Sequence, residues 1–166
     1  MPDIKVFLYG LDFAGKTALS ETIKHAKTFV DTKPTIRVII SNTLIKNISF
    51  YIWDLPGQIG LRDKWLKALE HSKILIFVLD TADTHRFPEA KKEFFSILNH
   101  PESKGIPLIF CFHKMDLQEA KNNLTEAQAV FDLKYIKDRQ IVLLETSINL
   151  LDTIEELKER MVSFFS

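Results

Sequence analysis

Residues 10–17 read GLDFAGKT, which has the spacing G-x-x-x-x-G-K-[ST] of a phosphate-binding loop. An apolar run, Ile4 to Tyr9, precedes this segment, and a helix-compatible segment, 16–27, follows it. The glycines let the backbone curl so that successive N–H groups point at one anion, and the helix adds the positive end of its dipole. The motif predicts that Lys16 reaches the β- and γ-phosphates of a nucleotide and that Thr17 places its hydroxyl on Mg²⁺. A glycine-containing turn with a chance lysine is the alternative, and the flanking segments disfavour it.

The segment His113-Lys114-Met115-Asp116 follows the apolar run 107–112 and indicates which base the nucleotide carries. A carboxylate here can accept hydrogen bonds from N1–H and the 2-amino group of guanine. Adenine lacks that pair of donors, and a buried acceptor left unpaired is costly, so Asp116 favours guanine. Lys114 can lay its aliphatic stem along the base. Taken alone, the four-residue motif could also be a solvated turn.

Two further segments could serve the γ-phosphate and a metal ion. Asp54 follows the apolar strand 48–52, where it suits an outer-shell contact to Mg²⁺. Gly57 allows a backbone N–H to approach the γ-phosphate, and Gln58 can orient a water. Thr35 lies between the first helix and the next strand and could close onto Mg²⁺ when the γ-phosphate is present. Each segment alone could be an ordinary turn, but their order and spacing after a phosphate loop favour one shared site.

With these motifs in this order, the chain resembles the small GTPases, and among them the Arf family (Arf, Arl and Sar), over essentially its whole length. The segments that carry the resemblance are 10–17, 34–36, 53–58, 79–87 and 98–101. The resemblance implies an α/β, P-loop GTPase (Ras-like) fold, with a mostly parallel six-stranded sheet, one antiparallel edge strand and helices on both faces. It also implies a GTP- and GDP-binding molecular switch that uses Mg²⁺, in membrane-trafficking or signalling-type regulation. GTP hydrolysis would be slow without an activating protein, and an exchange factor and effector proteins would be further partners.

The resemblance also implies a set of site residues. Lys16, Gly57 and Gln58 would serve catalysis, and Thr17, Thr35 and Asp54 would serve the metal. The nucleotide-binding positions would be Asp12, Phe13, Ala14, Gly15, Lys16, Thr17, Ala18, Thr35, Gly57, His113, Lys114, Asp116, Ser147 and Ile148. Arg62 is expected in the helix after Gln58. No arginine closely precedes Thr35, so the catalytic arginine would come from an activating protein.

Several positions depart from the pattern of standard Arf proteins. His113 stands where most relatives carry Asn, although Rag-type GTPases carry a similar His-Lys-x-Asp. Pro56 has no N–H and replaces the first Gly of the usual Gly-Gly-Gln. Arg37, Val38 and Ala68 differ at switch and effector-binding positions, which predicts a different partner surface. These departures leave open a guanine-nucleotide-binding scaffold subunit with little hydrolysis. A P-loop ATPase or small-molecule kinase is disfavoured by Asp116 and by the lack of an Arg-rich, lid-like segment.

The composition narrows the remaining classes. The net charge is zero, so nothing favours a nucleic-acid partner. The one cysteine, Cys111, lies in an apolar strand, which fits an inert buried thiol and a reducing, cytoplasmic location. No apolar run reaches transmembrane length. Pro2 stands where lipidated Arf proteins carry Gly, and residues 163–166 include no prenylation cysteine, so the termini do not support membrane attachment.

We expect one small GTPase domain over residues 1–166. The predicted strands are 4–9, 36–42, 46–53, 73–80, 107–112 and 140–145, and the predicted helices are 16–27, 62–70, 85–99, 124–136 and 150–164. The run 74–79 is continuously apolar, as in a parallel strand covered on both faces. Residues 36–53 are typical of a hairpin that turns near 42–46 and forms the antiparallel edge. One face of the last helix is predicted to carry Leu150, Ile154, Leu157, Met161 and Phe164.

Overall fold

The computed structural model describes residues 3–25 and 37–166, and it is built on one sheet with the strand order β2-β3-β1-β4-β5-β6. The strands are β1 (Ile4–Tyr9), β2 (Ile39–Ile45), β3 (Ile48–Asp54), β4 (Ile74–Asp80), β5 (Leu108–His113) and β6 (Ile141–Glu145). Only the pair β2 and β3 is antiparallel; all other neighbouring strands of the sheet are parallel. The predicted sheet is confirmed, with β2 as its antiparallel edge.

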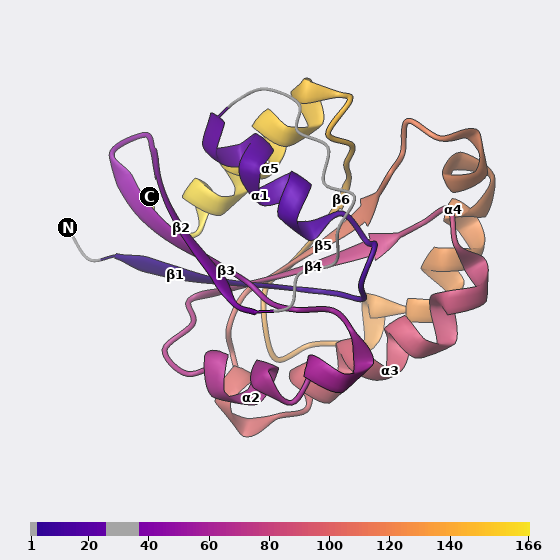
Figure 1. Ribbon diagram of the computed structural model, residues 1–166, viewed down its shortest axis with the longest axis horizontal. Helices are drawn as coiled ribbons and strands as arrows, with labels where there is room; N and C mark the ends of the chain where they lie inside the picture. The colour runs from indigo at the N-terminus through magenta and orange to yellow at the C-terminus, as the bar shows by residue number, and fades with distance from the viewer. Residues whose placement is uncertain (1–2, 26–36) are drawn as a thin grey trace.

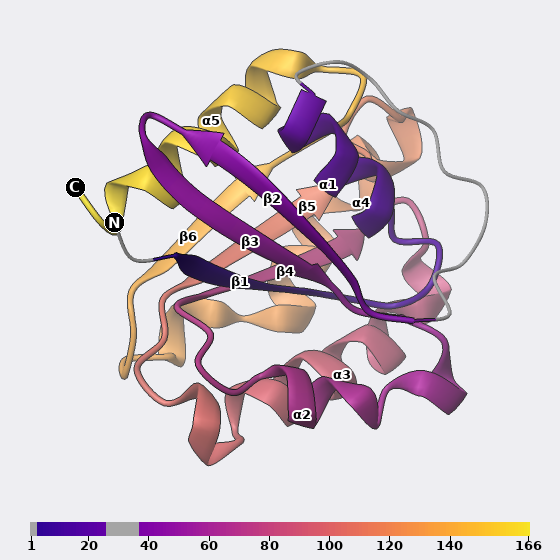
Figure 2. The same cartoon turned by 60° about the vertical axis from the view of Figure 1, so that its left-hand side comes forward.

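Helices cover both faces of this sheet (Figure 1). The α-helices are α1 (Lys16–His25), α2 (Lys64–Ala68), α3 (Phe87–Leu98), α4 (Gln118–Phe131) and α5 (Leu151–Ser163). Short 3-10 helices precede or follow them at η1 (Ile59–Leu61), η2 (Thr84–Arg86), η3 (Pro101–Ser103) and η4 (Leu133–Tyr135). Helices α1 and α5 pack on one face, and α2, α3 and α4 pack on the other (Figure 2).

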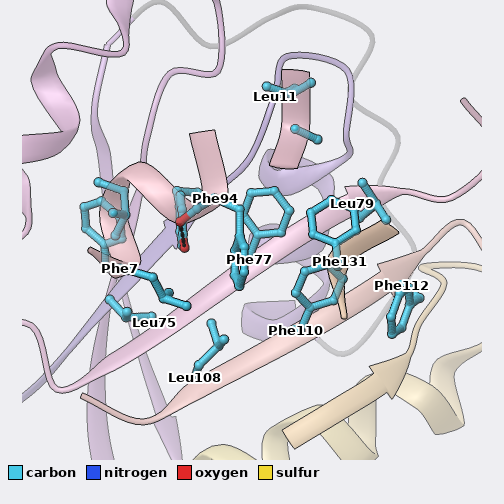
Figure 3. Packing of buried hydrophobic residues seen from close by; sticks show 14 of the residues in the cluster. Phe7, Leu11, Leu75, Phe77, Leu79, Phe94, Leu108, Phe110, Phe112 and Phe131 are labelled. Carbon is cyan, nitrogen blue, oxygen red and sulfur yellow. Dashed lines mark hydrogen bonds between the residues drawn. The ribbon is translucent and has the colours of Figure 1, made fainter. Parts of the chain in front are cut away.

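Alternation along the central strands separates two buried clusters. In β4, Leu75, Phe77 and Leu79 face α2, α3 and α4, whereas Ile74, Ile76 and Val78 face α1 and α5. This is the period of two that a strand imposes, although every one of these positions is apolar. The first face is aromatic: Phe77 lies with Phe94, Phe110 and Phe131 in one group of rings (Figure 3).

The sequence misplaced the hairpin turn and the two ends of one helix. The hairpin turns at Lys46 and Asn47, which have φ of 48° and 67°, so it overlaps the predicted 42–46 only at Lys46. A two-residue turn of type I′ needs left-handed backbone at both positions, and Asn adopts it more readily than most residues. Helix α4 begins at Gln118, six residues before the predicted start, and ends at Phe131, because Asp132 follows with a left-handed φ of 44°. Ala120 is fully buried, so packing against the sheet extends the helix toward its N-terminus.

The other helices are close to their predicted positions. The segment predicted as 62–70 is instead η1 followed by the short helix α2, and Arg62 lies between them, outside the α-helix. In α5, Ile154, Leu157 and Met161 are buried as predicted, but Leu150 precedes the helix and is 41% exposed. Cys111 is fully buried, and burial raises the pKa of its thiol to about 12. No helix of the described residues is both long and apolar enough to cross a membrane.

Candidate functional site

The carboxyl ends of the parallel strands meet at one edge of the sheet, and the candidate residues gather there. β1 leads into the phosphate loop, β3 ends at Asp54, β4 at Asp80 and β5 at His113. This edge is where open α/β sheets bind ligands, because the loops that leave adjacent strands surround a common space. Thr35, predicted for the metal and the γ-phosphate, lies outside the described residues.

The phosphate loop combines left-handed backbone with tight packing. Phe13 and Gly15 have φ of 64° and 101°, and α1 begins directly afterwards at Lys16. A β-carbon on Gly10 would lie 2.5 Å from the carbonyl oxygen of Val78, so β4 packs against the start of the loop. The predicted strand, loop and helix are therefore all present, with the N-terminus of α1 at the loop.

Lys16 is folded back over its own loop. Its Nζ donates a hydrogen bond of 2.9 Å to the carbonyl oxygen of Leu11, and only 5% of the residue is exposed. Burial lowers the pKa of Lys16 to about 8, against the opposing effect of the nearby Asp54 and Asp12 carboxylates. A buried ammonium, in an environment of low dielectric constant, interacts strongly with an anion placed beside it.

Asp54 and Thr17 bring a carboxylate and a hydroxyl together at the end of β3. The Thr17 hydroxyl donates to Oδ2 of Asp54, and Asp54 is 1% exposed. Hard oxygen donors of this kind fit Mg²⁺, which proteins often hold through one or two side chains together with substrate phosphates. The described part of the chain holds no cluster of three or more His, Cys, Asp or Glu that could bind a metal alone. The donor set therefore fits a metal ion whose remaining ligands come from a phosphate chain.

Gly57 presses against the phosphate loop. A β-carbon at position 57 would lie 2.3 Å from the backbone nitrogen of Asp12, so only glycine fits here. Side chains hold the carbonyl before Gly57 and the carbonyl of Gly57 itself. Trp65 Nε1 donates to the Pro56 oxygen at 2.8 Å, and Arg62 Nε donates to the Gly57 oxygen at 2.9 Å. Gln58 follows with extended backbone, φ −67° and ψ 140°.

A cavity of about 340 Å³ lies beside the phosphate loop, at the ends of β5 and β6. Its volume is within the range of small-molecule sites, which is roughly 300–1,000 Å³. The predicted nucleotide-binding residues that line it are Phe13, Gly15, Ala18, His113, Lys114, Asp116, Ser147 and Ile148. Leu117 and Asn149 complete the lining. The phosphate loop and the segment 113–116, more than 90 residues apart in the sequence, therefore line one cavity together with the segment after β6.

The Asp116 carboxylate is oriented by two donors from the segment after β6. Ser147 Oγ donates to Oδ1 at 2.7 Å and Asn149 Nδ2 donates to Oδ2 at 2.9 Å. Partial burial raises the pKa of the Asp116 carboxyl, but these hydrogen bonds outweigh it and hold the pKa below its ordinary value. The group is thus an ionised double acceptor at neutral pH.

His113 and Lys114 connect the cavity to the phosphate loop. His113 is 2% exposed, and its Nδ1 lies 2.8 Å from Thr146 Oγ1. Burial, reinforced by the Lys114 charge, lowers the pKa of His113 to about 4, so the imidazole is neutral near pH 7. Lys114 Nζ donates to the Phe13 carbonyl at 2.7 Å and to Asp80 at 2.9 Å. These contacts tie the phosphate loop to β4 and β5.

Sequence reasoning missed four residues of this edge. Arg86 donates to the carbonyl and carboxylate oxygens of Asp12 at 2.9 and 2.7 Å, and Arg62 forms ion pairs with α3. Asp80 and Asn149 were missed as well. The position of Asp80 directly after a continuous apolar run was a usable signal, and Arg86 lies in the segment 79–87 that carries the family resemblance. Nothing in the spacing indicated which carboxylates the two arginines would contact.

The chain has recognisable relatives. A family model described as "ADP-ribosylation factor family" matches residues 2–164. ADP-ribosylation factor 3 of Arabidopsis thaliana is 33% identical over 144 residues, which is 87% of this chain and 78% of that protein. ADP-ribosylation factor-like protein 6 of Danio rerio is 34% identical over 140 residues, covering 82% of this chain and 75% of that protein.

A solved structure shows the same fold. The Arl6 small GTPase of Trypanosoma brucei, with the bound nucleotide analogue GppNp, superposes with a TM-score of 0.82. The match covers 99% of this chain and 100% of that one, at 22% sequence identity. At this level of identity the superposition establishes the fold and leaves residue roles to be argued from this chain.

Proposed function

The chain belongs to the ADP-ribosylation factor family of small GTP-binding molecular switches, and we propose that it hydrolyses its own bound GTP to GDP and phosphate, slowly unless an activating protein assists. The observation that carries the proposal is the placement of Gly57 and Gln58. Gly57 lies in contact with the phosphate loop at Asp12, and its carbonyl is fixed, so Gln58 begins from a defined position beside the loop.

Guanine nucleotide would occupy the cavity and the phosphate loop together. The Asp116 carboxylate would accept from the two donors on the Watson–Crick edge of guanine, in the cavity that Ser147, Ile148, Phe13 and Ala18 also line. The loop from Asp12 to Thr17 would surround the phosphates with N–H groups, with Ala14 and Gly15 at its centre. Mg²⁺ would be held by Thr17 and by Asp54, directly or through water, and would neutralise phosphate charge; Thr35 is the proposed third protein group.

Hydrolysis needs placement and charge neutralisation more than covalent chemistry. A water attacks the γ-phosphorus while the bond to the oxygen that bridges to the β-phosphate breaks. Gln58 would orient that water, Lys16 would stabilise the charge on the β- and γ-phosphates, and the Gly57 N–H would face the γ-phosphate. Both described arginines of this edge, Arg62 and Arg86, are already paired with carboxylates. An arginine from an activating protein would therefore add on the order of 10³–10⁵ in rate.

The setting of this switch is also proposed. We infer that residues 1–166 form one nucleotide-binding domain, since a single sheet with helices on both faces spans the described chain. An exchange factor, an activating protein and effectors would bind the segments on either side of β2 and β3. The buried, inert thiol of Cys111 is consistent with a reducing, cytoplasmic location.

The test is single-turnover hydrolysis of GTP loaded on the purified protein, with Mg²⁺ present. We expect slow conversion to GDP, and we expect Gln58→Leu to slow it on the order of tenfold while GTP affinity stays nearly unchanged. Stimulated turnover should be lost in the same variant. Retained GTP with no conversion in the wild type would contradict the proposal and indicate a nucleotide-binding scaffold. An equal rate in Gln58→Leu would remove the role of Gln58.

A further inference from the structure

Arg62 has an unusual position for a charged residue so close to a nucleotide site. It lies between η1 and α2, four residues after Gln58, and its side chain is only 6% exposed. Its Nε donates to the carbonyl oxygen of Gly57, so the side chain reaches back over the turn that contains Gln58. The guanidinium therefore fixes the peptide group that joins Gly57 to Gln58.

The guanidinium is itself fixed by α3. Its Nη2 donates to Glu89 Oε2 at 2.7 Å, and its Nη1 lies 3.3 Å from Glu93 Oε1. Glu89 and Glu93 are one helical turn apart, so both carboxylates face the same side of α3. A planar guanidinium presents its donors in a rigid fork, and a lysine could not reach two carboxylates and a carbonyl in this geometry.

One of these carboxylates, that of Glu89, also anchors the phosphate loop. Glu89 Oε1 accepts from Arg86 Nε at 3.1 Å, and Arg86 in turn holds Asp12. Asp12 Oδ1 lies 3.9 Å from Arg62 Nη2, which closes the network. Two neighbouring arginines therefore hold both the phosphate loop and the Gly57–Gln58 peptide in place against one helix, α3.

We propose that Arg62 is a positioning residue for GTP hydrolysis, which holds the Gly57 carbonyl from its anchor on Glu89 and Glu93 and so sets where the Gln58 side chain begins. Arg62 acts through Gln58 and does not touch the substrate. The proposal rests on the hydrolysis proposed above. Displacing a catalytic group by about 1 Å can cost on the order of 10² in rate, so a clamp on its backbone has a measurable consequence.

A double-mutant cycle between the two residues tests this in the full chain. We expect Arg62→Gln to slow single-turnover hydrolysis by up to about the tenfold expected for loss of Gln58, with GDP affinity within about threefold of wild type. In a Gln58→Ala background the same substitution should change the rate by less than about twofold, because the group it positions is gone. Equal slowing in both backgrounds would overturn the proposal. So would a loss of GDP affinity as large as the loss of rate.

Arg139→Gln is the matched control for removal of a buried arginine. The Arg139 side chain is 1% exposed and donates to the carbonyls of Leu98, Ser103 and Ile106, before β5 and on the opposite edge of the sheet from the phosphate loop. Both variants should lower the melting temperature, whereas only Arg62→Gln should slow hydrolysis. Slowing of hydrolysis by Arg139→Gln to the same extent would show a general effect of destabilisation and overturn the assignment.

Hydrogen–deuterium exchange supplies a readout that does not depend on turnover. With a non-hydrolysable GTP analogue bound, Arg62→Gln should speed amide exchange of residues 57–61 at least about tenfold and leave β4 unchanged. If the wild type does not hydrolyse GTP, the proposed function fails while this measurement still tests the clamp. Unchanged exchange at 57–61 would overturn the inference whatever the hydrolysis rate.

Discussion

The imidazole of His113 lies directly against Gly15 of the phosphate loop. A β-carbon built on Gly15 would be 2.9 Å from His113 Cδ2 and 3.1 Å from Nε2. On its other side, the ring meets Thr146 through Nδ1. One buried ring thus connects the loop expected at the phosphates to the two strand ends expected at the base. A substitution on one side of the ring should therefore alter the structure on the other side.

Gly15→Ala should strongly weaken nucleotide binding. Its φ of 101° is strained for any residue with a β-carbon, and the added methyl would also collide with His113. We expect GDP affinity to fall on the order of 10²-fold, measured by fluorescence titration with a labelled GDP. Gly105→Ala is the control, because φ there is 77° but the space is open. A similar loss of affinity in Gly105→Ala, far from the phosphate loop, would show a general effect of backbone strain on the fold and not an effect at the loop.

His113 should make the fold sensitive to mild acid. Its pKa is about 4 in the folded state and 6.5 ordinarily, so the unfolded chain takes up the proton first. The stability that the neutral ring provides is complete above pH 6.5 and is lost as the pH falls toward 4, on the order of 3 kcal/mol in total. In His113→Asn, the free energy of unfolding measured by urea denaturation should depend less on pH between 6.5 and 4. His71→Asn is the control, because His71 is exposed and its φ of 64° suits Asn; an unchanged slope in His113→Asn would contradict the assignment.

Lys16 should couple nucleotide binding to proton uptake. Its pKa is about 8 in the dry loop, and phosphates placed beside it would raise that value. Binding is therefore favoured while Lys16 is protonated, and GDP affinity should fall as the pH rises above 8. Calorimetry near pH 8.5, in two buffers of different ionisation enthalpy, should show uptake of roughly one proton. Identical heats in the two buffers would mean that Lys16 does not change its protonation on binding.

Asp116 should discriminate between guanine and hypoxanthine. Inosine triphosphate lacks the 2-amino group, so it would leave one oxygen of the carboxylate without its partner from the base. We expect GTP to bind roughly tenfold to hundredfold more tightly than inosine triphosphate, and Asp116→Asn to reduce the preference to about threefold or less. Asp138→Asn, which changes an exposed carboxylate paired with the buried Arg139, should leave the preference unchanged. A preference that survives in Asp116→Asn would place the base elsewhere.

The strands that sequence reasoning located best are those in which local pattern and tertiary environment agree. β1 was predicted at its observed bounds, and β4, β5 and β6 within one residue, because continuous apolar runs between polar residues leave little choice of register. The start of α4 was missed because residues 118–123 are mostly polar and only the burial of Ala120 ties them to the core. The hairpin was misplaced because its turn depends on left-handed backbone at Lys46, which composition does not reveal.

By itself the sequence determined the order of the strands and helices along the chain, the phosphate loop and the residue types expected at a guanine nucleotide. These are local properties, because a curled loop, a helix start and an apolar strand each depend on residues a few positions apart. Only the tertiary structure decided that Arg62 and Arg86 share the carboxylates of α3 and that His113 packs on Gly15. Such contacts join residues far apart along the chain. They form because folding brings the carboxyl ends of neighbouring strands together, and buried charges there stay charged only where opposite charges or carbonyls meet them.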